Sequence, residues 1–425
     1  MKKINIESDL MEVLKKGGIA LFLRILGFLA GYLFVYYTVL YFGAETQGRI
    51  SLSFSFLMIA SLICILGADV NFVKLFAIEN NFDNAKGLFL KAYPFFVGGS
   101  LLIGILIFLG SNWISINFFK DPELAPFLKW TAPSIVLYTL MLINASVFRG
   151  LRQNTLYAFL FNGGRFIFTM IFFWLLVFFW SKDPITTAIA HTIAVAVLFI
   201  ISLGYLRKYI TPLSKKTKYK VASFLKDSFP MFLSASMIVL LGWADTIILG
   251  IYEDSATVGM YSVALKIATV VSFSLQAVDS ILAPKLSHAY HGGNYLLFKK
   301  LIKFATYINA LFSITSVVGI FLFKDFILNI FGSEFIAAST ALLILCVGQL
   351  FNSVVGPVGS IFQMTGYQKV FQNILVVSFI INLILNLTLV TAYGINGVAF
   401  ATAFSLIFSK IASAFYIKKL IWKTP

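Results

Sequence analysis

The sequence predicts an all-α polytopic membrane protein with about 12 transmembrane helices, arranged as two parallel-repeat six-helix lobes around a central cavity. Apolar residues make up 60% of the 425 residues, charged residues only 12%, and the mean hydropathy is +0.92. An ordinary soluble domain carries about a quarter charged residues, so a soluble enzyme is excluded. The apolar residues form continuous runs such as LLIGILIFLG, whereas an outer-membrane barrel alternates apolar and polar residues.

Twelve apolar runs lie between polar breaks, and each is long enough for a membrane-spanning helix of ~20 residues. They fall at 17–42, 50–76, 88–111, 130–149, 155–181, 185–206, 227–250, 257–281, 301–323, 335–362, 369–392 and 396–417. Residues 1–16 have Ile6, Leu10 and Val13 at helical spacing among charges, which predicts a short amphipathic helix on the membrane surface. The first run is too long for the core of a cleavable signal peptide.

The distribution of Lys and Arg predicts the orientation. With the N-terminus in the cytoplasm, 24 of these residues fall on the inside and 5 on the outside. This asymmetry follows the positive-inside rule for an even number of spans, so both termini are predicted to be cytoplasmic, in the cell inner membrane. Because the basic residues lie between spans, the net charge of +16 is attributed to topology, and no nucleic-acid partner is predicted.

The longest polar break, RKYITPLSKKTKYK at 207–220, separates two groups of six spans. We therefore expect an N-terminal lobe at 1–210, a basic cytoplasmic linker at 211–226 and a C-terminal lobe at 227–425.

The two halves resemble each other weakly. When Gly48 is aligned with Gly259, Asp69 falls beside Asp279. Each half starts on the cytoplasmic side, so the repeats are parallel. This is the organisation of two-lobed secondary transporters, whose substrate site lies between the lobes.

Four cations lie inside predicted spans, where each costs ~2.5–3.5 kcal/mol near the bilayer centre on insertion scales. They are Arg24, Arg165, Lys266 and Lys410. Each shares a helical face with small or polar residues, which favours a position facing the protein interior. A cavity lined by these cations fits an anionic substrate such as a phosphate or pyrophosphate. Arg24 and Lys410 are near enough to a span end to snorkel instead, and Asp245 is an alternative partner for Lys266.

Other polar residues inside the spans are fewer. Asn382 and Asn386 belong to a polar line on the eleventh span, where they bond either sugar hydroxyls or a neighbouring helix. Asp245 and His191 are weaker candidates for coupling a proton or cation to transport. His191 is equally explained as a hydrogen-bonded core residue.

Several motifs are absent from the sequence. No GxxxxGK[ST] occurs, so the chain carries no P-loop, and His288 and His291 lack the further ligands of a zinc site. Cys64 and Cys346 are interpreted as core residues. No catalytic residue, metal or cofactor is predicted, apart from a coupling cation or proton of unknown identity. The longest outside loop, about 112–129, is too short for a catalytic domain, which counts against a membrane enzyme of polysaccharide assembly.

Several stretches resemble bacterial polysaccharide exporters. ADTIILGIYEDSATVGMYSVALKIATVV at 244–271 and APKLSHAY at 283–290 are similar to the seventh and eighth spans of Wzx-type flippases of lipid-linked oligosaccharides. These belong to the multidrug/oligosaccharidyl-lipid/polysaccharide exporter superfamily. LFLRILGFLAGYLFVYYTVLYFGAETQGRISL near the start and YGINGVAFATAFS at 393–405 show the same likeness, which extends over the whole chain.

The resemblance implies two lobes around a cationic cavity that opens alternately to either side. It implies transport of an undecaprenyl-pyrophosphate-linked oligosaccharide to the periplasmic leaflet, for O-antigen, lipopolysaccharide, capsule or similar polymers. Arg24 in FLRILGF resembles the first-span arginine of the related lipid II flippases. The implied partners are the lipid-linked anionic oligosaccharide, membrane lipid and polysaccharide assembly enzymes. The alternative is a cation-coupled multidrug exporter of the same superfamily, which prefers acids in its cavity.

Overall fold

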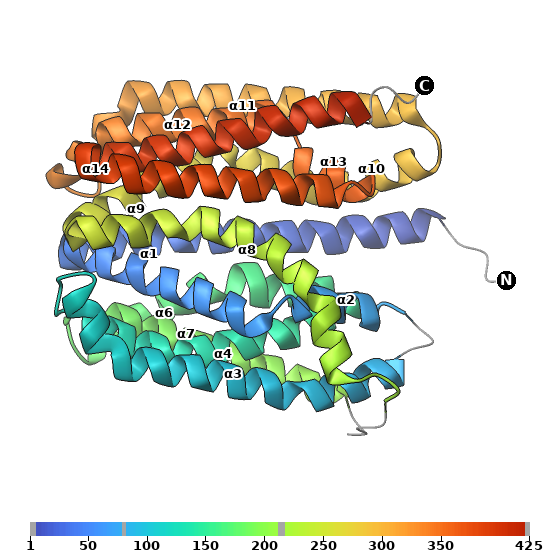
Figure 1. The fold of residues 1–425 in the computed structure, drawn as a ribbon, viewed down its shortest axis with the longest axis horizontal. Helices are drawn as coiled ribbons and strands as arrows, with labels where there is room; N and C mark the ends of the chain where they lie inside the picture. The colour runs from blue at the N-terminus through green and yellow to red at the C-terminus, as the bar shows by residue number, and fades with distance from the viewer. Residues whose placement is uncertain (1–5, 79–81, 211–216, 421–425) are drawn as a thin grey trace. The chain divides into compact units, whose positions relative to one another are not determined.

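The computed structural model describes residues 6–78, 82–210 and 217–420, and every regular element in these ranges is helical (Figure 1). The helices are α1 (Ile6–Ile65), α2 (Ala68–Phe76), α3 (Phe82–Asn117), α4 (Leu124–Gly150), α5 (Asn154–Ala158), α6 (Gly164–Phe179), α7 (Thr186–Ile210), α8 (Val221–Tyr252), α9 (Ser255–Thr269), α10 (Phe273–His291), α11 (Tyr295–Asn329), α12 (Ser339–Val354), α13 (Val358–Met364) and α14 (Gln368–Leu420). A π-helical turn η2 (Phe159–Gly163) and two 3₁₀ turns, η3 (Val270–Ser272) and η4 (Ser333–Ala338), lie between them. The predicted all-α class is confirmed.

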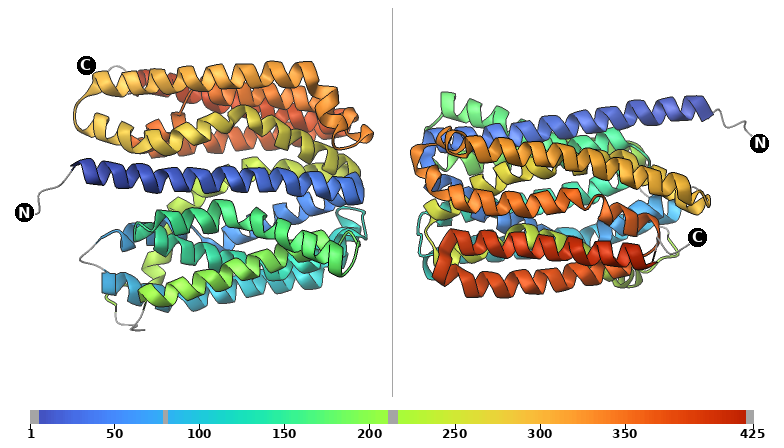
Figure 2. Two further views of the ribbon diagram at one scale, coloured as in Figure 1. Left: turned by 180° about the vertical axis from the view of Figure 1, so that it is seen from behind. Right: turned by 90° about the horizontal axis from the view of Figure 1, so that it is seen from above.

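In the described residues, nine helices are long and apolar enough to cross a membrane, and α5 with α6 forms a bent tenth candidate. Two of the nine are interrupted by a glycine with positive φ, Gly43 in α1 and Gly394 in α14. Both helices fold back at these glycines (Figures 1 and 2). Their apolar parts are 44 and 52 residues long, enough for two spans each. Counted in this way, the described residues contain the predicted twelve spans.

Several predicted spans are less regular than the sequence suggested. The predicted span 50–76 is divided, because Leu66 and Gly67 adopt positive φ between α1 and α2. A Cβ atom on Gly67 would lie 2.4 Å from the backbone nitrogen of Phe232, so only glycine fits there. The fifth span bends at η2, and the eighth is interrupted by η3.

The predicted N-terminal segment and the predicted linker are only partly included in the described residues. Of the amphipathic segment predicted at 1–16, the structure describes the backbone of residues 6–16, which forms the first part of α1. Residues 211–216 of the predicted linker lie outside the described residues, and 221–226 already belong to α8.

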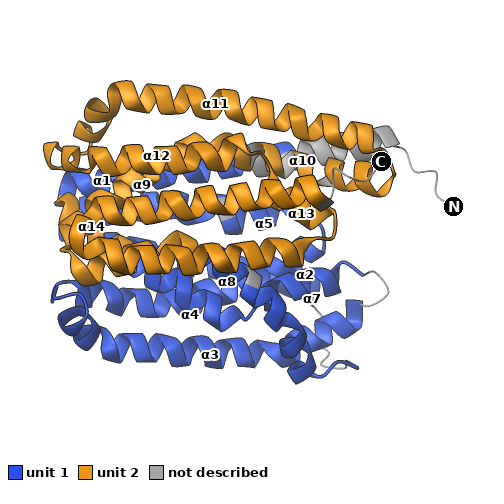
Figure 3. Ribbon diagram, turned by 45° about the horizontal axis from the view of Figure 1, so that its top comes forward, with its two compact units in different colours: residues 1–41, 53–239 blue, residues 42–52, 240–425 orange. Residues whose placement is uncertain are grey.

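The chain forms two compact units, shown separately coloured in Figure 3. Unit 1 comprises residues 1–41 and 53–239, and unit 2 comprises residues 42–52 and 240–425. In unit 1, α4 is the central helix and packs against α2, α3 and α7. In unit 2, α12 packs against α9, α11 and α14. The outer faces of α3 and α11 expose large apolar side chains, as expected of helices in contact with lipid.

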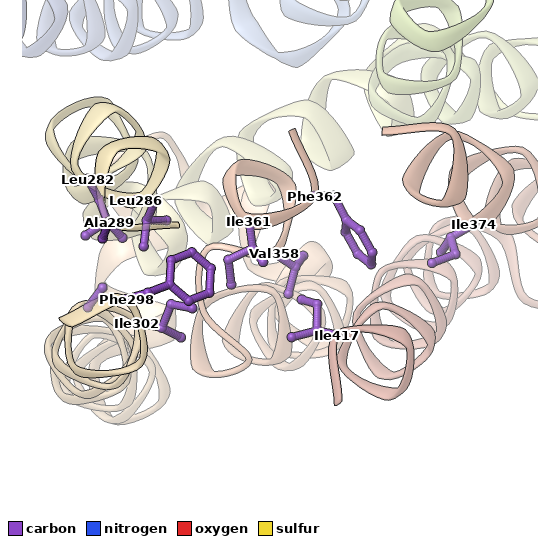
Figure 4. Packing of buried hydrophobic residues seen from close by; sticks show 11 residues of the cluster. Leu282, Leu286, Ala289, Phe298, Ile302, Val358, Ile361, Phe362, Ile374 and Ile417 are labelled. Atoms are coloured by element: carbon purple, nitrogen blue, oxygen red, sulfur yellow. The ribbon is translucent and has the colours of Figure 1, made fainter. Parts of the chain in front are cut away.

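One end of unit 2 contains a buried apolar cluster (Figure 4). Side chains of α10 and α11 meet those of α13 and α14 there, and Phe298 and Phe362 are its largest members. The cluster packs the short helix α13 against its neighbours, and His291 Nε2 of α10 lies 3.1 Å from the carbonyl oxygen of Met364 in α13. It therefore has a packing role.

Candidate functional site

Arg165 lies at the start of α6, directly after the π-helical turn η2 that bends the fifth span. Its guanidinium carbon lies 4.5 Å from the ring centroid of Phe166, 5.5 Å from that of Tyr138 and 5.8 Å from that of Phe54. We call these three rings the aromatic cage. Each cation–π contact contributes about 0.5–2 kcal/mol, so together they offset much of the cost of holding this cation within a span.

The guanidinium of Arg165 retains most of its hydrogen-bonding capacity. Nη1 lies 3.9 Å from the sulfur of Met58, a weak acceptor, and no carboxylate in the described part of the chain pairs with this arginine. Arginine carries five N–H donors in a planar fork that suits phosphate oxygens. The side chain is half-buried, so the cage holds a cation that is still able to receive an anion.

His191, the second predicted residue of this region, shares Phe54 with Arg165. Its ring centroid lies 4.5 Å from that of Phe54, and its buried Nε2 has no hydrogen-bond partner among the described residues. The alternative, a core histidine held by hydrogen bonds, would place a partner at Nε2, and none of the described residues provides one. An orphaned buried nitrogen costs free energy and calls for an explanation.

Arg24 comes from the first arm of α1, next to the same bend. A Cβ atom on Gly163 would lie 2.9 Å from the carbonyl oxygen of Leu23, so α1 and η2 touch at this point. Arg24 and Arg165 are therefore on neighbouring helices at a similar depth in unit 1. Gly27 and Gly31, predicted to share a close-packed face with Arg24, are both buried.

Asp245 forms a buried polar centre in unit 2. It is only 1% exposed. Asn386 Nδ2 donates to its Oδ1 at 2.6 Å, while Tyr261 Oη at 3.2 Å and Thr402 Oγ1 donate to its Oδ2. Asn386 also donates to Asn382 Oδ1 at 3.1 Å. These five residues, the Asp245 centre, come from α8, α9 and both arms of α14.

The pairing of Asp245 with Lys266 is corrected by this geometry. The partners of the carboxylate are neutral donors, and Lys266 is not among them. Lys266 is on the next helix, in the last turn of α9 and five residues beyond Tyr261. Burying a carboxylate that no cation neutralises costs free energy, so such a residue within a span is by default a candidate for a functional role. Asn386 Oδ1, also buried and without a hydrogen-bond partner in the described part of the chain, adds a second oxygen for a proton or cation.

Lys266 and Lys410 occupy two further places in unit 2. Lys266 is half-buried beside η3. Lys410 is half-buried on α14, where Asp279 of α10 interacts with it electrostatically. This acid favours the charged form of Lys410. A role for either lysine in substrate binding stays a prediction.

The structure thus groups the predicted residues into two sets. Arg165, His191 and Arg24 gather in unit 1, and Asp245, Asn382 and Asn386 gather in unit 2. Sequence reasoning missed the cage rings, Tyr261 and Thr402. Tyr261 and Thr402 were within the quoted stretches at 244–271 and 393–405, as polar groups inside apolar runs.

Comparison with known families identifies the chain. The model of the family described as "Polysaccharide biosynthesis protein" matches residues 13–290, well over half of the chain. The chain belongs to this family. The MatE model matches residues 230–388, which include most of the Asp245 centre.

Two relatives are archaeal membrane proteins. The probable low-salt glycan biosynthesis flippase Agl15 of Haloferax volcanii is 28% identical over 235 residues, covering 55% of this chain and 50% of that protein. The uncharacterized membrane protein MJ1068 of Methanocaldococcus jannaschii is 27% identical over 271 residues, covering 60% and 51%. The matched part of this chain spans about half the length of these curated relatives.

Solved structures share the fold. An inward closed conformation of the lipid II flippase MurJ has a TM-score of 0.74 at 19% identity, covering 95% of this chain and 87% of that one. An inward-facing multidrug resistance MATE family transporter of the MOP superfamily has a TM-score of 0.72 at 15% identity, covering 96% and 100%. The predicted resemblance to this superfamily is confirmed.

Proposed function

We propose that the protein is a secondary transporter that flips a lipid-linked oligosaccharide across the membrane by alternating access. Membership of the polysaccharide biosynthesis family and the flippase name of the Haloferax relative support this proposal. The observation that carries it is Arg165, a caged guanidinium within a span with no acid partner in the described residues. The same proposal includes undecaprenyl pyrophosphate as the carrier, an O-antigen or capsule product, a location in the inner membrane, and cytoplasmic termini.

Arg165 would act on the phosphate end of the substrate. The cage rings hold the guanidinium by cation–π contacts, which use none of its N–H donors and leave them for paired bonds to phosphate oxygens. Such bonds are stronger in a low-dielectric site than in water. Arg24, at a similar depth on the neighbouring helix, would add a second positive charge.

The Asp245 centre would couple transport to a proton or cation gradient. Its carboxylate and the free amide oxygen of Asn386 are acceptors for either ion. Occupation of the centre would change the charge buried among α8, α9 and α14, and so bias the conformational equilibrium. Without a P-loop, uphill transport draws on an ion gradient, the membrane potential or consumption of the product.

The proposal is tested in proteoliposomes with a fluorescent lipid-linked oligosaccharide. We expect Arg165→Ala to lower the flipping rate by tenfold or more, because an anion in a dry site loses a charged partner. Arg165→Lys keeps the charge but not the paired geometry, and retains part of the rate. Lys208→Ala, an exposed cation at the end of α7, is the matched control. Full activity of Arg165→Ala at normal abundance would falsify the anion-binding role.

A second candidate function is cation-coupled export of small molecules. The Asp245 centre favours it, because this superfamily branch prefers acids, and the MatE match covers most of that centre. The same proteoliposomes distinguish the two functions. Saturable, gradient-driven transport of a fluorescent organic cation, with no flipping of the lipid-linked oligosaccharide, would establish the second function.

A further inference from the structure

A cavity of about 310 Å³ lies at the end of unit 1 that is predicted to face the cytoplasm. It is bounded by α2, α3 and the start of α8. Its walls include Leu75, Leu88 and Phe224, of which Leu88 and Phe224 are buried. None of the residues of the aromatic cage or of the Asp245 centre lines it. It is therefore separate from the residues proposed for transport.

The rim of the cavity carries the polar groups. Lys218, Tyr219 and Lys220 are exposed there, together with Ser223 and Asp227 of the first turns of α8. The lining includes two lysines and one aspartate, so the rim carries a net positive charge. Hydroxyl groups of Tyr219 and Ser223 add neutral donors.

The rim is held in place by specific hydrogen bonds. Thr217 Oγ1 donates to the carbonyl oxygen of Asn84 at 2.9 Å, and the N–H of Lys218 donates to Asn84 Oδ1 at 3.1 Å. On the opposite wall, Asn71 Nδ2 donates to Ser228 Oγ at 3.0 Å. Asn84 thus fixes the lysine-bearing segment to α3, while Asn71 joins α2 to α8. Hydrogen bonds therefore connect both walls of the cavity to neighbouring helices.

This combination suits one chemical class. Lysine side chains bind phosphate as point charges, and a carboxylate beside them accepts hydrogen bonds from hydroxyl groups. An apolar floor below a charged rim fits the junction between a head group and an acyl chain. Lysines near the cytoplasmic surface also attract anionic lipids.

We propose that this cavity binds the phosphate of an anionic glycerolipid whose head group carries hydroxyls. Lys218 and Lys220 bind the phosphate, Asp227 accepts from the head-group hydroxyls, and the floor contacts the glycerol and the first acyl carbons. A soluble phosphate ester shares this chemistry, so the experiment includes it as a competitor.

The test measures binding of fluorescent phosphatidylglycerol to the purified full chain in neutral detergent. We expect the double variant Lys218→Gln, Lys220→Gln to weaken binding by about tenfold or more, because two charges near the phosphate are lost. Lys226→Gln is the matched control, since this exposed lysine of α8 does not line the cavity. It should change the affinity less than twofold.

Two further measurements identify the occupant. Asp227→Asn should weaken binding of phosphatidylglycerol more than that of phosphatidic acid, which has no hydroxylated head group. Millimolar glycerol 3-phosphate should not displace the lipid. Equal losses of lipid affinity in the double variant and in Lys226→Gln would show that binding depends on general surface charge, and would overturn the proposal. Unchanged lipid binding by a double variant with a normal melting temperature would overturn it as well. Displacement by glycerol 3-phosphate would show that the cavity binds a soluble phosphate ester, and would overturn the proposal of a lipid ligand.

Discussion

The carboxylate of Asp245 is the most informative single group in unit 2, because every donor that reaches it is neutral. Three hydrogen bonds from α9 and the two arms of α14 stabilise the ionised form, and no cation among the described residues is paired with it. A substitution that removes this charge but keeps the shape of the side chain distinguishes a coupling role from a packing role.

We predict that Asp245→Asn remains folded and abundant but loses the dependence of transport on an ion gradient. The side chains are nearly isosteric, so the packing of α8 against α14 should persist. Transport down the substrate gradient, measured in proteoliposomes with and without imposed proton or sodium gradients, should continue. Ser378→Ala is the control, because that buried hydroxyl on α14 bonds only to the carbonyl oxygen of Ile374. Gradient-driven transport at the wild-type rate would contradict the coupling role.

Single residues were easier to predict than their partners. A charged or amide side chain within an apolar run is conspicuous, so Asp245, Asn386 and Arg165 were found in the sequence. Asn386 lies 141 positions from Asp245, and the contact depends on the rotation and depth of two helices, which no local pattern records. The cage rings were hidden among 46 phenylalanines and 18 tyrosines. The pairing of Lys266 with Asp245, which was left open as an alternative, was suggested by their places on consecutive helices, and it is not among the hydrogen bonds of Asp245.

At the scale of elements, one helix crossing has almost no space between its backbones. A Cβ atom on Gly48 would lie 1.7 Å from the carbonyl oxygen of Ser255, and one on Gly259 would lie 2.0 Å from that of Ala44. Each segment has the small-xxx-small spacing that allows close helix contact. The two glycines that the repeat alignment paired therefore meet within unit 2. Gln47 Nε2 donates to Ser262 Oγ at 3.0 Å beside them.

We predict that Gly48→Ala and Gly259→Ala each destabilise the protein by about 1–3 kcal/mol or more, because a methyl group overlaps backbone atoms that cannot rotate away. Detergent-solubilised protein should melt several degrees lower in a fluorescence size-exclusion assay. Gly98→Ala is the matched control, since a Cβ atom there meets nothing within 4 Å. Equal melting temperatures for all three variants would show that the crossing tolerates a side chain.

The elements themselves were largely readable from apolar runs, because a span needs a continuous apolar stretch. The turns at Gly43 and Gly394 fall where the runs were interrupted. The π-helical turn before Arg165 and the 3₁₀ turn at η3 were not predicted, since both replace a few hydrogen bonds inside a run without changing its composition. The break after Ile65 was missed because Gly67 is compatible with a helix until its positive φ is known.

At the scale of the whole molecule, the twelve-span count and the charge asymmetry make one joint claim about topology. An even number of spans puts both termini on one side, and 24 of the 29 loop and terminal Lys and Arg residues fall on that side. If either division, at Gly43 or at Gly394, were not a return through the membrane, every later loop would change sides. Without the return at Gly43 the charge asymmetry of the later loops would be reversed, and without the return at Gly394 the C-terminal lysines would move to the outside.

We therefore predict the labelling pattern of single cysteines placed in a variant lacking Cys64 and Cys346, both of which are buried. Glu45, Asp254 and Tyr393 are exposed beside turns assigned to the outside, so cysteines there should react with an impermeant maleimide added to intact cells. Cysteines at Lys218 and Gly293, exposed on the opposite side, should react only after the membrane is opened. A reversed pattern at Lys218, Asp254, Gly293 and Tyr393, with Glu45 unreactive even after the membrane is opened, would remove the return at Gly43. Protection at Tyr393 with labelling at Asp254 would remove the return at Gly394, and a reversed pattern at all five positions would invert the orientation while preserving the span count.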